Sequence, residues 1–141
     1  MNKRFLIWTE IHEQIRKIAN DIRQSNIKLT HIKGMQRGGL IPAVLLSHEL
    51  GLPMVESDLG RIDDRLLIVD DICDTGTTLN YFTQFGCPTA TLHYKKTAKV
   101  EPMFWAEEAE VGEWIVYPWE KRDADAIPDY LVGANKDLKE F

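Results

Sequence analysis

The segment 66–79 holds the residues whose types and spacing are best suited to chemistry. An apolar run at 66–69 leads into two adjacent carboxylates, Asp70 and Asp71. After two residues comes the run Asp74, Thr75, Gly76, Thr77 and Thr78. Backbone N–H groups of small residues at the start of a helix bind anions, and threonine hydroxyls add donors. The segment therefore predicts a cradle for one phosphate monoester, beside carboxylates suited to sugar hydroxyls or a hydrated Mg²⁺.

A purely structural reading of the same residues is also open. Asp70 and Asp71 would then end a strand, and Asp74 or Thr75 would cap a helix. That reading suits an isolated Asp-Thr-Gly, whereas the whole pattern, an apolar strand followed by Asp-Asp-x-x-Asp-Thr-Gly-x-Thr, is far more specific. The loop has no lysine, so it differs from the Gly-Lys-Ser/Thr loop of nucleotide-binding P-loop proteins.

Alternating strands and helices must position this segment. Apolar periodicity and Gly/Pro boundaries predict helices at 11–22 (with Thr9 as N-cap), 40–50 and 77–85, and strands at 29–35, 53–56, 66–69, 89–94 and 114–117. The order indicates an α/β fold, a single-domain, mostly parallel twisted sheet flanked by helices. Ligands bind at the carboxyl ends of such strands, so the loops after residues 35, 69, 92 and 117 should surround the site.

Composition limits the class of protein. The 141 residues predict one domain, 1–141, and the net charge of −5, from 17 basic and 22 acidic residues, argues against nucleic acid as a partner. No apolar run is long enough for a membrane span, and only four apolar residues precede Thr9, which predicts a cytoplasmic protein. Cys73 and Cys87 fit neither a disulfide framework nor a metal cluster.

The stretch 66–79 resembles the phosphoribosyl pyrophosphate (PRPP) signature of the type I phosphoribosyltransferases. Three further segments resemble one branch, the bacterial xanthine–guanine enzymes and related 6-oxopurine enzymes. They are 36–42 (Gln-Arg-Gly-Gly-Leu-Ile-Pro), 92–95 (Leu-His-Tyr-Lys) and 114–120 (Trp-Ile-Val-Tyr-Pro-Trp-Glu). The resemblance covers roughly residues 32–120. It implies the family's fold with a small C-terminal hood from about residue 96 to 141.

The activity implied by the resemblance is transfer of the phosphoribosyl group of PRPP to guanine, xanthine or hypoxanthine. The products are the nucleoside 5′-monophosphate and pyrophosphate, the cofactor is Mg²⁺, and the context is purine salvage. The resemblance assigns Asp70 and Asp71 to the ribose and metal, 74–78 to the 5′-phosphate, and Arg37, Gly38 and Gly39 to pyrophosphate. It makes Asp74 the acid/base at purine N7, and it places a non-proline cis peptide bond between Gln36 and Arg37.

The resemblance also assigns the purine side of the site. Lys95 would donate to purine O6, with Lys96 as the alternative if the register slips by one residue. Trp114 would stack on the base with Ile115 beside it, and Glu120 would be a further metal ligand. Adenine carries an amino group in place of O6, so the lysine implies a preference for oxopurines.

Two features depart from the family pattern. The family has a long loop that closes over the site, whereas here only 57–64 is available, and Lys33 occupies a strand that is usually apolar. Two other functions therefore stay open: a PRPP- or nucleotide-binding regulatory protein, and a phosphoribosyltransferase for another nucleobase. The need to cover the site predicts a homodimer or homotetramer. The sequence chooses neither the preferred oxopurine nor a role for the tail after Asp123.

Overall fold

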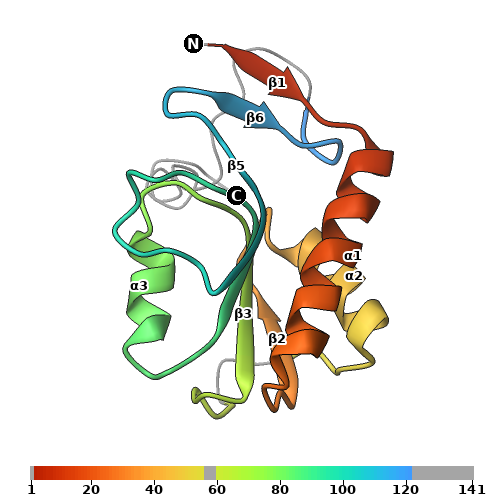
Figure 1. Cartoon of the computed structure of the whole chain (residues 1–141), viewed down its shortest axis with the longest axis vertical. Helices are drawn as coiled ribbons and strands as arrows, with labels where there is room; N and C mark the ends of the chain where they lie inside the picture. The colour runs from red at the N-terminus through yellow and green to blue at the C-terminus, as the bar shows by residue number, and fades with distance from the viewer. Residues whose placement is uncertain (1, 56–59, 122–141) are drawn as a thin grey trace, which may run out of the picture.

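The computed structural model describes residues 2–55 and 60–121 (Figure 1). Its elements, in chain order, are β1 (Lys3–Phe5), α1 (Trp8–Ser25), β2 (His31–Gly34), α2 (Leu40–Leu50), β3 (Leu66–Cys73), α3 (Thr77–Thr83), β4 (Thr89–Tyr94), β5 (Phe104–Glu108) and β6 (Trp114–Val116). No helix in these ranges is long and apolar enough to cross a membrane. The predicted tail after Asp123, and residues 57–59 of the short loop, lie outside the described residues.

The main sheet has the strand order β2-β3-β4-β5, and every pair in it is parallel. Helices α1 and α2 pack on one face, against β4 and β5 and against β2 and β3 respectively, while α3 packs on β3 from the other side (Figure 1). The predicted α/β fold with a parallel sheet between helices is confirmed. Strands β3 and β4 lie in the middle, and 66–69 are fully buried, as a strand covered on both faces requires.

The hood, here β1 and β6 with the turn that follows to Glu120, differs from the prediction because an N-terminal segment, 3–5, helps to build it. Strand β1 pairs in parallel with β6, with Lys3 opposite Trp114 and Phe5 opposite Val116. This two-stranded sheet lies beyond one end of the main sheet (Figure 1). Strand β5 pairs with β4 and so belongs to the main sheet, although it falls inside the range predicted for the hood.

Helix α1 buries the predicted stripe, Ile11, Ile15, Ile18, Ala19 and Ile22. Its start was predicted wrongly. Ile7 is the N-cap, and the Glu10 carboxylate accepts a hydrogen bond from the Ile7 N–H at 3.1 Å. Thr9 is exposed in the first turn, because a glutamate three residues after the cap satisfies the helix end without a threonine hydroxyl.

Several boundaries also differ from the prediction. Strand β3 continues to Cys73, so both adjacent carboxylates lie within it, and α3 ends at Thr83. The predicted strand at 53–56 is reduced, within the described residues, to one bridge between Met54 and Ile32. Strands β1 and β5 were not predicted.

Candidate functional site

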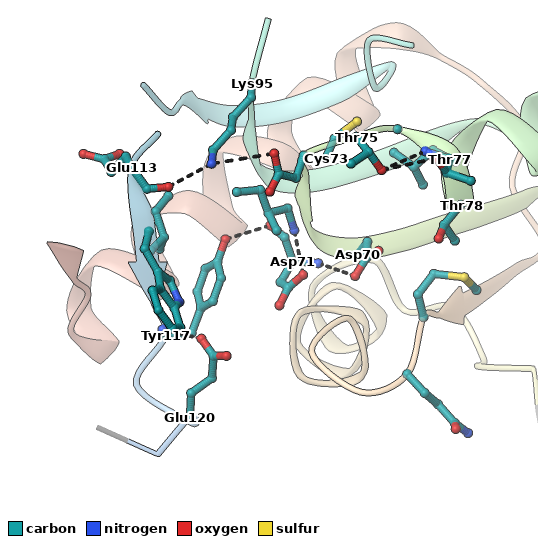
Figure 2. Close-up of a pocket in the computed structure, with 18 residues that line it drawn as sticks. Asp70, Asp71, Cys73, Thr75, Thr77, Thr78, Lys95, Glu113, Tyr117 and Glu120 are labelled. Carbon is teal, nitrogen blue, oxygen red and sulfur yellow. Dashed lines mark hydrogen bonds and ion pairs between the residues drawn. The ribbon is translucent and has the colours of Figure 1, made fainter. Parts of the chain in front are cut away.

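A cavity of about 410 Å³ opens where β3 and β4 end beneath the hood (Figure 2). It is lined by the end of β3 and the loop after it, by Lys95 after β4, and by residues of the hood. Its lining comprises Met35, Gln36, Asp70, Asp71, Ile72, Cys73, Asp74, Thr75, Gly76, Thr77, Thr78, Leu79, Lys95, Glu113, Trp114, Ile115, Tyr117 and Glu120. Most of the residues singled out in the sequence therefore meet in one place.

Backbone hydrogen bonds orient the two carboxylates of β3. Asp70 Oδ1 accepts from the Asp71 N–H at 2.9 Å, and Asp71 Oδ1 accepts from the Ile72 N–H at 2.8 Å. Asp71 is buried, with 6% of its surface exposed. Both side chains are held at the cavity wall, where hydroxyl groups of a sugar can donate to them.

The loop 74–78 forms a compact turn into α3. The N-cap of α3 is Gly76, in the left-handed conformation at φ 81°, and a Cβ there would lie 2.9 Å from the Lys99 nitrogen. The Lys99 N–H donates to the Thr75 carbonyl at 2.9 Å, and the Thr77 N–H donates to Thr75 Oγ1 at 3.3 Å. Gly76 occupies the N-cap position, so neither Asp74 nor Thr75 stands there, although the Thr75 hydroxyl accepts from the first N–H of α3 as a capping side chain would.

Lys95 connects the loop to the hood. Its Nζ donates to the Glu113 carbonyl at 2.8 Å and lies 3.6 Å from Asp74 Oδ1 (Figure 2). The Lys95 residue is buried, with 7% exposed. Lys96 is exposed and lies 3.5 Å from Glu108 Oε1, outside the cavity. The structure thus brings Lys95, and not the alternative Lys96, into the site.

The hood supplies the aromatic wall. Trp114 and the buried Ile115 line the cavity, and the Lys3 ammonium lies 4.5 Å from the centre of the Trp114 ring, a cation–π contact. Glu120 also lines the cavity, but its carboxylate accepts from the Tyr117 N–H at 2.8 Å. Glu120 therefore fixes the turn that follows β6, in addition to any contact with a ligand.

The loop after β2 reaches the cavity only in part. The peptide bond between Gln36 and Arg37 is cis, as the family resemblance implied. Met35 and Gln36 line the cavity, whereas Arg37, Gly38 and Gly39 do not. The Gly39 N–H donates to the Met35 carbonyl at 2.8 Å, and a Cβ on Gly39 would lie 2.6 Å from the Val69 carbonyl. The role of Gly39 here is close packing against β3, and its amide is already used.

Tyr117 is a site residue that the sequence reasoning missed. Its hydroxyl donates to the Asp71 carbonyl at 3.1 Å and lies 2.9 Å from His93 Nδ1. Complete burial, followed by the nearby Asp71 carboxylate, raises the pKa of Tyr117 well above its ordinary value. Burial lowers the pKa of His93 to about 4, so its ring is neutral near neutral pH. The sequence reasoning assigned no role to His93, and no spacing along the chain links residues 71, 93 and 117.

The residues at the cavity fit a magnesium ion that is shared with a phosphorylated ligand. Carboxylate oxygens such as those of Asp70 and Asp71 are hard donors, and Mg²⁺ is commonly held by one or two carboxylates together with substrate phosphates and water. Within residues 2–55 and 60–121, no three His, Cys, Asp or Glu side chains gather into a ready-made metal cage. Any Mg²⁺ would therefore depend on the ligand for most of its coordination.

Comparison with known proteins agrees with this geometry. The xanthine-guanine phosphoribosyltransferase of Gluconobacter oxydans (strain 621H) is 26% identical over 137 residues, which cover 80% of this chain and 82% of that protein. The purine phosphoribosyltransferase of Pyrococcus horikoshii Ot3 is 30% identical, with a TM-score of 0.71, and the match covers 91% of this chain and all of that one. No family model matches the sequence.

A second similar structure carries a ligand. It is a hypothetical protein from Neisseria gonorrhoeae with bound ppGpp, 24% identical, with a TM-score of 0.67 over 88% of this chain and 92% of that one. At that identity the likeness shows a shared fold. The Pyrococcus protein, in contrast, is similar enough in sequence and coverage to show which family this chain belongs to. The chain belongs to the type I phosphoribosyltransferase family and is homologous to purine phosphoribosyltransferases.

Proposed function

We propose that this protein transfers the phosphoribosyl group of PRPP to a 6-oxopurine base, giving a nucleoside 5′-monophosphate and pyrophosphate in purine salvage. One observation carries the proposal: a single cavity brings together the carboxylate pair of β3, the threonine-rich loop, a buried lysine and an aromatic hood. These groups match, in order, a ribose, a phosphate, a carbonyl oxygen and a flat base.

On the sugar side, Asp70 and Asp71 accept hydrogen bonds from the ribose hydroxyls, directly or through metal-bound water. The loop 74–78 holds the 5′-phosphate with backbone N–H groups and threonine hydroxyls. Arg37 and Gly38 directly follow Gln36 at the edge of the cavity, and on the family resemblance they hold the pyrophosphate group, because the planar guanidinium binds phosphate oxygens in pairs. Gly39 contributes by letting this loop pack closely against β3.

On the base side, the Lys95 ammonium has three N–H donors. The Glu113 carbonyl takes one, the Asp74 carboxylate lies within ion-pair distance, and a donor remains for purine O6. Adenine presents an amino group at the same position, which is itself a donor. Trp114 stacks on the base and Ile115 packs beside it.

In the reaction, a purine ring nitrogen forms a bond to C1 of PRPP while the C1–O bond to pyrophosphate breaks. The Asp74 carboxylate accepts the proton that the purine loses from N7. Negative charge grows on the leaving pyrophosphate. Asp70, Asp71 and Glu120 would hold Mg²⁺, which would supply positive charge to offset it. The other residues act by positioning and by fixed charge.

A regulatory protein that binds PRPP or a purine nucleotide is the second candidate. The similar structure with bound ppGpp favours it, because a guanine nucleotide presents the same groups as the proposed product, a phosphate, a ribose and a 6-oxopurine. The short loop at 57–64 also favours it, because loops that close over a site exclude water from the reaction. A pyrimidine enzyme is less suited to the buried Lys95 and the Trp114 wall.

The test is PRPP-dependent release of pyrophosphate with guanine, xanthine, hypoxanthine and adenine in the presence of Mg²⁺. We expect turnover with an oxopurine and none with adenine. Asp74→Asn should lower kcat by about 10²–10⁴-fold, the usual contribution of a general acid or base. Asp21→Asn, on the exposed side of α1, is the matched control and should keep wild-type kcat.

Two results would point elsewhere. Tight Mg²⁺-dependent binding of PRPP or a guanine nucleotide, measured by calorimetry without turnover of any base, would favour the regulatory protein. Turnover with uracil alone would assign the enzyme to pyrimidines.

A further inference from the structure

Strand β6 is held at both of its ends by side chains that contact the main sheet. Before it, the Glu113 carbonyl accepts from Lys95 Nζ at 2.8 Å, and Lys95 directly follows β4. After it, the Tyr117 hydroxyl donates to the Asp71 carbonyl of β3 at 3.1 Å (Figure 2). Trp114 and Ile115 lie in the sequence between the residues that make these two hydrogen bonds. The spacing between the aromatic wall and the carboxylates is therefore set by two polar contacts.

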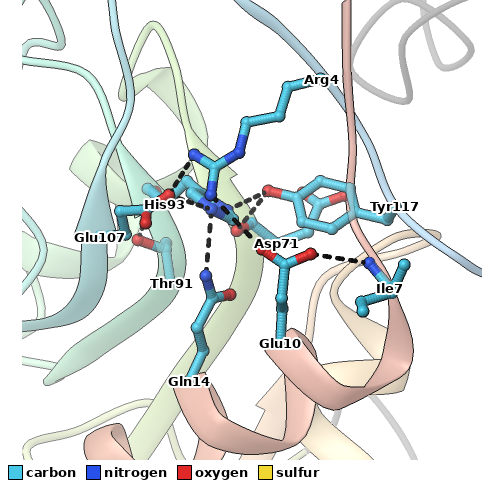
Figure 3. Close-up of polar contacts among 9 residues, drawn as sticks. All are labelled: Arg4, Ile7, Glu10, Gln14, Asp71, Thr91, His93, Glu107 and Tyr117. Carbon is cyan, nitrogen blue, oxygen red and sulfur yellow. Dashed lines mark hydrogen bonds and ion pairs between the residues drawn. The ribbon is translucent and has the colours of Figure 1, made fainter.

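Packing fixes the ring of Tyr117 on the hood side. The ring lies 4.8 Å from that of Trp119 and nearly parallel to it, at 7°, and Tyr117 is only 2% exposed. Its hydroxyl points away from this stack toward β3 and β4 (Figure 3). The Tyr117 hydroxyl therefore spans from the hood to the sheet, with little freedom to choose another partner.

The side chain of His93 also contacts the Tyr117 hydroxyl, from β4. Its ring is fully buried on β4, with Nδ1 at 2.9 Å from the Tyr117 hydroxyl. A phenol has one hydrogen, so a Tyr117 hydroxyl that donates to the Asp71 carbonyl can only accept from His93 Nδ1, and this arrangement requires the proton of the neutral imidazole on Nδ1. Nε2 of His93 then accepts from the amide nitrogen of Gln14 at 3.4 Å, whereas the Glu107 carboxylate at 3.3 Å favours a proton on Nε2, so the position of the proton is the quantity to measure (Figure 3).

The network continues to the N-terminal strand. Glu107 Oε1 lies 3.3 Å from His93 Nε2 and is paired with the Arg4 guanidinium of β1. Arg4 also lies 3.7 Å from Glu10 at the start of α1. The polar groups that surround His93 thus come from α1, β1, β5 and the hood, and they restrain its ring from several directions.

We propose that Tyr117, oriented by His93, is a positioning residue that sets the spacing between the purine-stacking strand and the ribose-binding carboxylates. The inference rests on the proposed function and deepens it. It assigns base binding to a residue that does not itself need to touch the base. Loss of the Tyr117 hydroxyl should loosen the hood end of the cavity while the PRPP loop, built from 70–78 and Lys99, stays in place.

The decisive variant is Tyr117→Phe, which keeps the stacked ring and removes only the hydroxyl. We expect KM for the oxopurine to rise about tenfold, the effect of one net hydrogen bond, with KM for PRPP changed by less than about twofold. Tyr94→Phe, which removes a hydroxyl from a mostly buried ring outside the cavity, should change neither constant. Equal rises in both constants for Tyr117→Phe would overturn the proposal, because they would indicate general damage to the fold.

A spectroscopic measurement tests the orientation independently of catalysis. Nitrogen-15 NMR of the wild-type protein near neutral pH should place the His93 proton on Nδ1. In Tyr117→Phe the His93 signals should move, because Nδ1 loses its acceptor. A proton on Nε2 in the wild type would overturn the arrangement, because the Tyr117 hydrogen would then point to His93 rather than to Asp71.

The inference and the proposed function fail in different ways. If the wild-type protein turns over no base, the proposed function fails, and binding of guanosine 5′-monophosphate and of PRPP is compared by calorimetry instead. Selective loss of affinity for the monophosphate in Tyr117→Phe would still support the positioning role. Unchanged affinity for both ligands would overturn it.

Discussion

Burial determines the charge of His93, and through it part of the stability of the molecule. Removal from water lowers the pKa of His93 from its ordinary 6.5 to about 4, while the Glu107 carboxylate acts in the opposite direction and is outweighed. The Arg4 hydrogen bond lowers the pKa of Glu107 as well. Both groups are therefore harder to protonate in the folded protein than in the unfolded chain.

This arrangement predicts a loss of stability in mild acid. Between pH 6.5 and about 4 the unfolded chain binds a proton at His93 that the folded protein does not, so the free energy of unfolding falls as the pH is lowered. The loss should reach up to about 3 kcal/mol over the whole window. Below the ordinary Glu107 value of 4.5, protonation of Glu107 adds to it. Urea unfolding at about pH 7 and about pH 5 measures the His93 part.

The control for this prediction is a pair of substitutions. His93→Gln removes the titrating group and should flatten the dependence on pH, although it lowers stability overall. His48→Gln, at an exposed position in the last turn of α2, is the matched substitution of a histidine outside this network. Identical slopes for wild type and His93→Gln would contradict the assignment to His93.

The same residues show how far sequence reasoning reaches at the site. Residues 70–78 are contiguous, so the carboxylates and the loop could be assigned from the sequence, and the structure places them on one cavity. Lys95 follows a strand whose burial could be predicted, which put its side chain near the same edge. Tyr117 follows β6 and His93 lies on β4, 24 residues earlier, and their contact exists only after the hood folds over the sheet. Periodicity does not encode such a contact.

Among the elements, predictions succeeded where glycine or proline marks a boundary in the sequence. They failed where a strand pairs with a segment far away along the chain. Helix α2 has the predicted bounds, with Gly51 in the left-handed conformation at its end, and β4 also has its predicted bounds. Strand β1 has three residues, and its partner β6 lies near the other end of the described chain. Strand β5 lies at the sheet edge and ends in two glutamates, so it lacks the apolar run of a central strand.

The turn between β3 and α3 gives a prediction at this scale. Gly76→Ala should weaken PRPP binding at least about tenfold, because the added Cβ would lie 2.9 Å from the Lys99 nitrogen and displace the loop. The left-handed backbone at φ 81° adds about 1–2 kcal/mol of strain for any residue with a Cβ. Calorimetry with PRPP and Mg²⁺ measures the affinity, and urea unfolding measures the stability.

Gly51→Ala separates the two effects. Gly51 has φ 67° and no atom within 4 Å of the added Cβ, and it lies at the end of α2, away from the cavity. This control should show the backbone strain in its unfolding free energy while it binds PRPP as the wild type does. Equal losses of PRPP affinity in both variants would attribute the loss to general destabilisation by left-handed strain rather than to the contact of residue 76 with Lys99.

For the molecule as a whole, α2 is one element whose apolar side chains the described residues leave partly uncovered. Its buried face, Pro42, Ala43 and Leu46, packs on the sheet, yet Leu40 and Val44 on the same helix are 37% and 41% exposed. Residues 40–46 of α2 are all apolar, and a helical stretch that is apolar on all sides is normally buried on all sides. Leu40 directly follows the pyrophosphate loop at 36–39, so a second copy on this face would also approach the site.

We therefore predict a homodimer that uses the exposed face of α2. Val44→Glu should dissociate it, because a buried interface does not accommodate an unpaired carboxylate. Sedimentation velocity of wild type and variant measures the change in mass.

Val111→Glu is the control. It makes the same substitution at a more exposed valine, 65% exposed, in the turn before β6, and it should leave the assembly intact. A monomeric wild type, or a Val44→Glu protein that stays dimeric, would contradict this use of α2. Loss of activity together with dissociation in Val44→Glu would indicate that the second copy covers the cavity.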